Sequence, residues 1–222
     1  LNAPSEDIQF WSKKILLSMG APAIKSLTGI LDEGTDVPLI PHIIAALLAM
    51  DHADAIPAVL RFIERNDDNH IQAVFNGISE IASREVVDTI LNLLSHNEDR
   101  VVGWLSFLLG KVQKPALRKS VLMGLNHPEE RGRFHVITAL KGWNNLPETE
   151  LKSVVRQLGV EKTPRNILGV ARILTNYPTP FVIDNLKEYL KKCEPDFMLE
   201  MMLILAETEK PAFETMLADI LR

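Results

Sequence analysis

The sequence predicts an all-α fold, an α-solenoid of about seven stacked helix pairs, and three observations carry this prediction. A segment of similar pattern recurs roughly every 31 residues along the whole chain. Its apolar residues follow the i, i+3, i+4, i+7 spacing of a helix face rather than the strict alternation of a strand. Prolines stand where these helices are expected to begin, and the first turn of a helix tolerates proline because its N–H groups have no intrahelical partner.

Seven segments define the repeat, and the fourth residue of each is a large apolar one. These anchor residues are Ile24, Ile56, Val87, Leu117, Leu151, Val182 and Phe213. Successive anchors are separated by 32, 31, 30, 34, 31 and 31 residues. A period in this range is typical of solenoids, in which each repeat buries its apolar face against its neighbours.

Each repeat pairs an anchored helix with another helix that precedes it along the chain. The anchored helices are predicted over residues 21–31, 53–63, 84–94, 114–124, 148–158, 179–190 and 210–221. The preceding helices are predicted over residues 8–19, 39–50, 71–82, 101–112, 133–143, 167–177 and 197–207. Within 71–82, helical spacing relates Ile71, Val74, Phe75, Ile78 and Ile81.

Composition and charge exclude several classes of protein. The longest uncharged run, residues 37–50, is shorter than the ~20 residues that a membrane-spanning helix needs, so no membrane span is predicted. The single cysteine, Cys193, makes no internal disulfide and fits a reducing compartment, so we predict a cytoplasmic location. Because the chain starts at Leu1 and repeats to its end, we expect one repeat domain over 1–222, excised from a longer protein.

Residues 52–102 carry a family resemblance. The stretch HADAIPAVLRFIERNDDNHIQAVFNGISEIASREVVDTILNLLSHNEDRVV resembles the short HEAT-like repeat in its Ala-Ile-Pro opening, its leucine-rich anchored helix and its acidic turn. The usual Val-Arg pair after the turn is inverted here, as Arg100 followed by Val101. The resemblance implies a right-handed α–α superhelix, in which the anchored helices are the second of each pair and line the concave face.

Local signatures of catalysis and of cofactor binding are absent from the sequence. It contains no Gly-x-Ser-x-Gly, no His-Glu-x-x-His and no paired cysteines, and it lacks the His-Glu dipeptides that ligate iron in HEAT-like hydroxylases. We therefore predict no catalytic residues, no metal site and no cofactor. Trp104 and Trp143 lie in neighbouring repeats, where they either fill gaps between helices or line an aromatic cleft, and we favour the packing interpretation.

Charge is distributed unevenly along the chain. The net charge is −8 over residues 1–100, +6 over 101–165 and −3 over 166–222. Positions 1, 2 and 5 after each anchor face away from the packing seam. From the second repeat onward, the basic residues at these positions, which we call the predicted basic strip, are Arg61, Arg118, Lys119, Lys152, Arg156 and Lys187. Such a strip is suited to an acidic or phosphorylated partner, and the competing interpretation is an ordinary solvated helix face.

These observations favour a non-enzymatic function over an enzymatic one. We expect a protein-binding scaffold or adaptor whose concave face holds a protein or peptide partner, with the predicted basic strip as its partner-binding residues. The alternative is a DNA-binding HEAT-like glycosylase of the alkylation-repair type, against which the net charge of −5 argues because phosphate neutralisation dominates DNA affinity. A resemblance to HEAT-like bilin lyases, which attach pigments to proteins, rests on fold alone.

Overall fold

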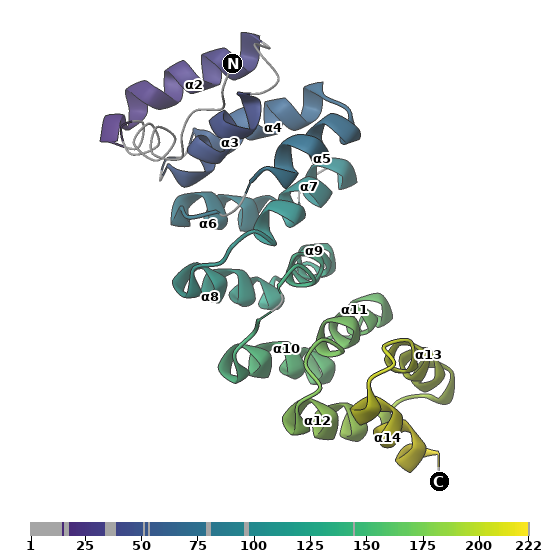
Figure 1. Ribbon diagram of the computed structural model, residues 1–222. Helices are drawn as coiled ribbons and strands as arrows, with labels where there is room; N and C mark the ends of the chain where they lie inside the picture. Colours follow the sequence, from purple (N-terminus) through teal and green to yellow (C-terminus); the bar gives the residue numbers. More distant parts are fainter. Residues whose placement is uncertain are drawn as a thin grey trace. The chain divides into compact units, whose positions relative to one another are not determined.

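The computed structural model describes residues 15, 18–33, 39–50, 52, 54–78, 81–95, 98–143 and 145–221. Within these residues every regular element is helical, and the described chain is a succession of short helices (Figure 1). The first predicted helix, residues 8–19, and Trp11 within it lie largely or wholly outside the described residues.

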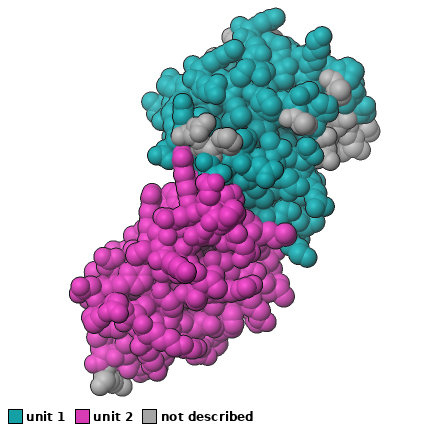
Figure 2. Space-filling view, turned by 180° about the vertical axis from the view of Figure 1, so that it is seen from behind, with its two compact units in different colours: residues 1–121 teal, residues 122–222 magenta. Residues whose placement is uncertain are grey.

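The chain divides into two compact units, residues 1–121 and 122–222, which we call unit 1 and unit 2 (Figure 2). Unit 1 contains α2 (Ala21–Glu33), α3 (Ile40–Ala49), α4 (Ala55–Arg65), α5 (Asp68–Asn76), α6 (Arg84–Leu93), α7 (Asp99–Leu109) and most of α8 (Pro115–Met123). Unit 2 contains the 3₁₀ turn η1 (Gly124–Asn126), α9 (Glu130–Leu140), α10 (Glu148–Val160), α11 (Pro164–Leu174), α12 (Pro180–Leu190), α13 (Pro195–Ala206) and α14 (Pro211–Ile220).

The helices stack in two parallel series within each unit. In unit 1 the second helix α4 packs on α2 and α6, while α3 packs on α5. In unit 2 the first helices α9, α11 and α13 stack in order, as do the second helices α10, α12 and α14. Stacking of like helices on like helices is the arrangement of an α-solenoid. The predicted all-helical solenoid class is therefore confirmed.

The anchor residues explain why the second helices pack in this register. All seven anchors, from Ile24 to Phe213, are buried.

Proline begins five of the described helices, at Pro115, Pro164, Pro180, Pro195 and Pro211. The α5, α6 and α12 helices have side-chain N-caps from Asp67, Ser83 and Thr179, which satisfy backbone N–H groups that the helix itself leaves without a partner.

One predicted helix is shorter than the spacing of its apolar residues suggests. The helix expected over residues 71–82 ends at Asn76, and Ile78 and Ile81 are buried outside any helix. Ile81 instead forms a parallel bridge to Val112, and its N–H donates to the carbonyl of Lys111. Gly77 permits this exit because a Cβ there would lie only 3.3 Å from the Cβ of Pro41. Backbone contact with neighbouring repeats thus overrides the helical spacing.

Polar side chains connect different repeats within each unit. Arg100 of α7 donates to the carbonyls of Ile63 and Asn66 at the end of α4, and its Nε lies 2.8 Å from Asp68 Oδ1. In unit 2 the hydroxyl of Tyr177 donates to the carbonyl of Trp143, 34 residues earlier, at 2.6 Å. These contacts satisfy carbonyls that helix ends leave without an intrahelical donor.

None of the described helices combines the length and the apolar character that are required to cross a bilayer.

Candidate functional site

The predicted basic strip is divided between the two units. Arg61, Arg118 and Lys119 belong to unit 1, whereas Lys152, Arg156 and Lys187 belong to unit 2. None of the six is buried: three are exposed and three are half-buried. Whether they act together as a partner-binding strip stays a prediction.

Two residues of the strip are engaged in ion pairs with the neighbouring repeat. Arg61 Nε lies 3.2 Å from Asp32 Oδ1, and Arg65 of the same helix contacts the same oxygen at 2.9 Å. The hydrogen bond from Arg61 outweighs partial desolvation and lowers the pKa of the Asp32 carboxyl. Lys187 Nζ lies 3.0 Å from Asp219 Oδ2. The charges of Arg61 and Lys187 are therefore partly neutralised within the protein.

The remaining residues of the strip are more accessible to a partner. Lys119, Lys152 and Arg156 are exposed, and Arg118 is half-buried. Lys152 forms an exposed i, i+4 ion pair with Glu148 at 3.3 Å, a kind of contact worth only a few tenths of a kcal/mol. Its ammonium remains available because so weak a pair is readily exchanged for another.

The tryptophans support the packing interpretation. Trp104 packs edge-on against Phe75, with ring centroids 5.7 Å apart, and its indole N–H donates to Asp68 Oδ1 at 2.9 Å. Trp143 is buried in unit 2. An aromatic cleft requires exposed ring faces on which a base can stack. The contacts of Trp104 hold adjacent repeats together, and the burial of Trp143 leaves its ring faces inaccessible to a base.

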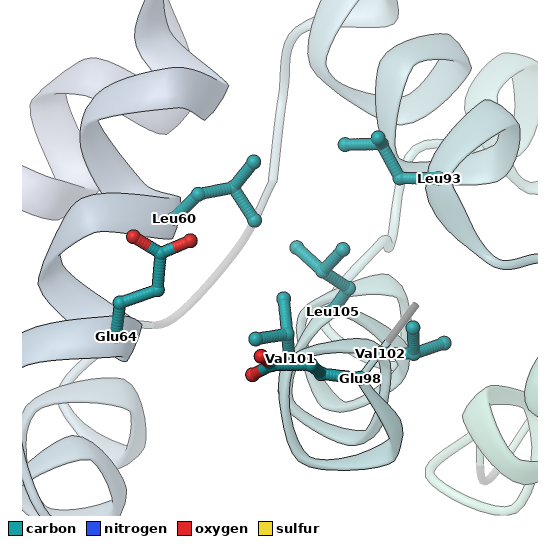
Figure 3. A pocket seen from close by; sticks show the side chains of 7 residues that line it. All are labelled: Leu60, Glu64, Leu93, Glu98, Val101, Val102 and Leu105. Carbon is teal, nitrogen blue, oxygen red and sulfur yellow. The ribbon is translucent and has the colours of Figure 1, made fainter. Parts of the chain in front are cut away.

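A pocket of unit 1 was not anticipated from the sequence. It encloses about 260 Å³ between α4, α6 and α7, and we call it the α4–α7 pocket. Its lining residues are Leu60 and Glu64 of α4, Leu93 of α6, Glu98 at the N-cap of α7, and Val101, Val102 and Leu105 of α7. Figure 3 shows Leu60, Leu93 and Leu105 extending into a common space.

The chemistry of the α4–α7 pocket is apolar with two acidic groups. Glu64 and Glu98 are exposed, and within the described part of the chain neither forms an ion pair. Glu64 also lies in the last turn of α4, where the negative end of the helix dipole disfavours a carboxylate. A cation bound between the two glutamates would relieve this local excess of negative charge.

The sequence contained partial signals for this pocket. Leu60 and Glu64 are one helical turn apart on α4, as are Val101 and Leu105 on α7. What the sequence did not reveal is the contact between α4 and α7, which belong to the second and fourth repeats. The early end of α5 at Asn76 accompanies this contact, and neither was predicted.

Unit 2 also carries basic residues that lie outside the predicted strip. Lys141 follows α9, and Arg165 and Arg172 lie on α11, so all three belong to the first-helix series. We call them the α9–α11 cation cluster. They lie outside the predicted strip because the strip contains residues of second helices alone, although Arg165 and Arg172 are two turns apart and share a helix face.

The comparisons with known proteins reveal no family. No protein-family model matches the chain, and no curated protein matches it. Among solved structures, an engineered protein matches with a TM-score of 0.41 and 12% identity, covering 92% of this chain and 97% of its own. A second engineered protein matches with a TM-score of 0.40 and 17% identity over 94% of both chains. Human deoxyhypusine hydroxylase in complex with glycerol matches with a TM-score of 0.40 and 14% identity, covering 90% and 88%.

Proposed function

We propose that this chain is a non-enzymatic protein-binding scaffold that receives a side chain of its partner in the α4–α7 pocket. The observation that carries the proposal is the pocket itself, in which apolar side chains from three helices meet two glutamates that have no basic partner among the described residues. Well-packed pockets that accept one anchoring side chain are where binding energy concentrates in protein interfaces.

The size of the pocket favours a side chain over a free small molecule. At about 260 Å³ it falls below the roughly 300–1,000 Å³ typical of small-molecule and cofactor sites. Lysine and arginine combine a long apolar stem with a charged end. Such a side chain would place its stem against Leu60 and Leu105 and its charge beside Glu64 and Glu98.

The exposed residues of the predicted basic strip are proposed as further contacts, each within its own unit. Lys119, Lys152 and Arg156 are assigned to peripheral contacts with acidic residues of the partner, and contacts of this kind accelerate association more than they add affinity. Arg61, Arg118 and Lys187 are assigned weaker contributions because they are half-buried, and two of them are already ion-paired. The proposed compartment is the cytoplasm, where Cys193 stays reduced.

The test begins with capture and ends with a purified partner. Protein retained from native lysate by the immobilised chain is identified by mass spectrometry, produced separately and titrated by calorimetry against three variants. Leu60→Trp fills the pocket, Glu64→Gln removes one carboxylate with little change of shape, and Leu199→Trp is the matched control at an exposed leucine of unit 2. Circular dichroism checks that each variant is folded.

We expect Leu60→Trp to weaken binding at least tenfold, equivalent to about 1.4 kcal/mol, and Leu199→Trp to leave affinity within about twofold. Glu64→Gln is expected to weaken binding by a smaller factor without affecting the fold. Full affinity of both pocket variants, or retention of no protein at all, would overturn the proposal.

A further inference from the structure

The α9–α11 cation cluster places three positive charges on one face of two adjacent helices. Helices α9 and α11 pack against each other, and Arg165 of α11 contacts Phe134 of α9, with its guanidinium carbon 3.6 Å from the ring centroid. Lys141 follows Phe134 by seven residues, and Arg172 follows Arg165 by seven. Seven residues are two helical turns, so each pair shares a face and spans roughly 10 Å.

These three charges have no ion-pair partner among the residues that the structure describes. Arg165, Arg172 and Lys141 are exposed, and none of them forms an ion pair with another described residue. Other basic residues of the solenoid behave differently, since Arg61, Arg100, Arg133 and Lys187 each contact a carboxylate 28 to 32 residues away in the sequence. Within the described part of unit 2, the cluster is therefore a local concentration of positive charge without ion-pair partners.

The ionisation of Lys141 supports this description of the local field. Partial desolvation of the ammonium group lowers the pKa of Lys141, and the positive charges of Arg172 and then Arg165 lower it further. A bound anion would act in the opposite direction, because a nearby negative charge favours the ammonium form.

The arrangement of the cluster matches an oxyanion. The ring of Phe134 covers one face of the Arg165 guanidinium and leaves the N–H groups at its edge able to donate. Because this cation–π contact already restricts the Arg165 side chain, less conformational entropy is lost when a ligand binds. Arginine N–H pairs and a lysine ammonium form short, charge-assisted hydrogen bonds to phosphate oxygens. A phosphate monoester, with nearly two negative charges at neutral pH, is the group that three cations compensate best.

The extent of the cluster decides between classes of phosphate ligand. Proteins that bind duplex DNA through its backbone neutralise about 6–10 phosphates. Three cations within roughly two helical turns match one phosphate group and its surroundings. We propose that the α9–α11 cation cluster binds a phosphorylated serine or threonine of a partner peptide.

The test uses NMR titration of the full chain with a short acetylated phosphoserine peptide at low ionic strength. The same peptide with serine, inorganic phosphate and a 12-base-pair DNA duplex are titrated in parallel. Arg165→Gln and Arg172→Gln remove charges of the cluster, and Lys191→Gln and Lys192→Gln are matched controls that remove exposed charges at the end of α12 in the same unit. Circular dichroism checks the fold of each variant.

We expect saturable binding of the phosphopeptide, with shifts confined to α9 and α11, and at least tenfold weaker binding in each cluster variant. The control variants should stay within about twofold of the wild type, and the serine peptide should not bind. Equal weakening by the Lys191 and Lys192 variants would show that the effect depends only on overall charge, and it would overturn the proposal. Tighter binding of the duplex than of the phosphopeptide, or binding of inorganic phosphate alone, would overturn it as well.

Discussion

Glu161 is the residue whose removal should most affect the stability of unit 2. Its side chain is fully buried at the end of α10, where it accepts hydrogen bonds from Arg133 Nε at 2.7 Å and Nη2 at 3.1 Å. It also accepts from the backbone N–H groups of Lys162 and Thr163 and from Asn166 Nδ2. Arg133 in turn donates to the carbonyls of residues 127 and 128, so this one contact joins two turns.

The magnitude of the effect follows from the ionisation of Glu161. Burial alone would raise the pKa of this carboxyl, but the hydrogen bonds from Arg133, Thr163, Asn166 and Lys162 outweigh it and lower the pKa from 4.5 to about 2. One pKa unit corresponds to about 1.4 kcal/mol, so ionised Glu161 contributes about 3 kcal/mol to stability at neutral pH. Because the folded pKa is lowered, this contribution is complete above about pH 5 and is lost as the pH falls towards 2.

The assay is urea unfolding followed by circular dichroism at several values between pH 7 and pH 2. Glu161→Gln should lower the free energy of unfolding by about 3 kcal/mol at pH 7, and its difference from the wild type should shrink steadily below pH 5. The control is Glu148→Gln, which breaks only the exposed pair with Lys152 and should cost less than about 0.5 kcal/mol. A difference between Glu161→Gln and the wild type that stays constant with pH would refute the reasoning.

Two further predictions concern packing in unit 2. Tyr177→Phe removes the hydroxyl that donates to the Trp143 carbonyl, and thermal unfolding should show a loss of about 1–3 kcal/mol because the buried carbonyl loses its donor; an unchanged melting temperature would mean that water replaces the hydroxyl. Gly132→Ala places a Cβ against the His127 imidazole and should destabilise by about 1–3 kcal/mol, whereas Gly159→Ala, with open space around its Cβ, should be neutral or stabilising by up to about 1 kcal/mol. Similar melting temperatures for these two alanine variants would contradict the predicted clash.

The second helices were predictable because one signal dominates their formation. The helix predicted over 148–158 is observed as Glu148–Val160, and that over 179–190 as Pro180–Leu190. In each, the anchor residue is buried and a proline stands at or just before the first turn. In these segments the proline at the helix start and the apolar face that becomes buried indicate the same helix. The apolar periodicity therefore predicts the helix bounds closely.

In the third repeat, the apolar spacing does not predict the end of the first helix. Its first helix has the same apolar spacing as the others, yet it ends at Asn76, where Gly77 allows close contact with Pro41 and Ile81 pairs with Val112. The apolar spacing indicates which residues are buried, but a residue can be buried without belonging to a continuous helix. The contact of α4 with α7 and the pocket between them accompany this irregularity.

The candidate sites, too, were predicted from the sequence only in part. The sequence identified basic residues on outward positions, and Lys119, Lys152 and Arg156 are indeed exposed. It did not distinguish them from Arg61 and Lys187, which are ion-paired with aspartates 29 and 32 residues away. The three cations of the α9–α11 cluster, which have no such pairs among the described residues, were not selected at all.

By itself, then, the sequence determined the all-helical class, the repeat period and the face of each second helix that is buried, because these depend on spacing along one helix. The tertiary structure decided which charges are compensated and where a pocket opens. Both depend on distances of a few ångströms between side chains about one or two repeats apart. Those distances are determined by how neighbouring helices pack, and a period that varies from 30 to 34 residues specifies them only to within about one helical turn.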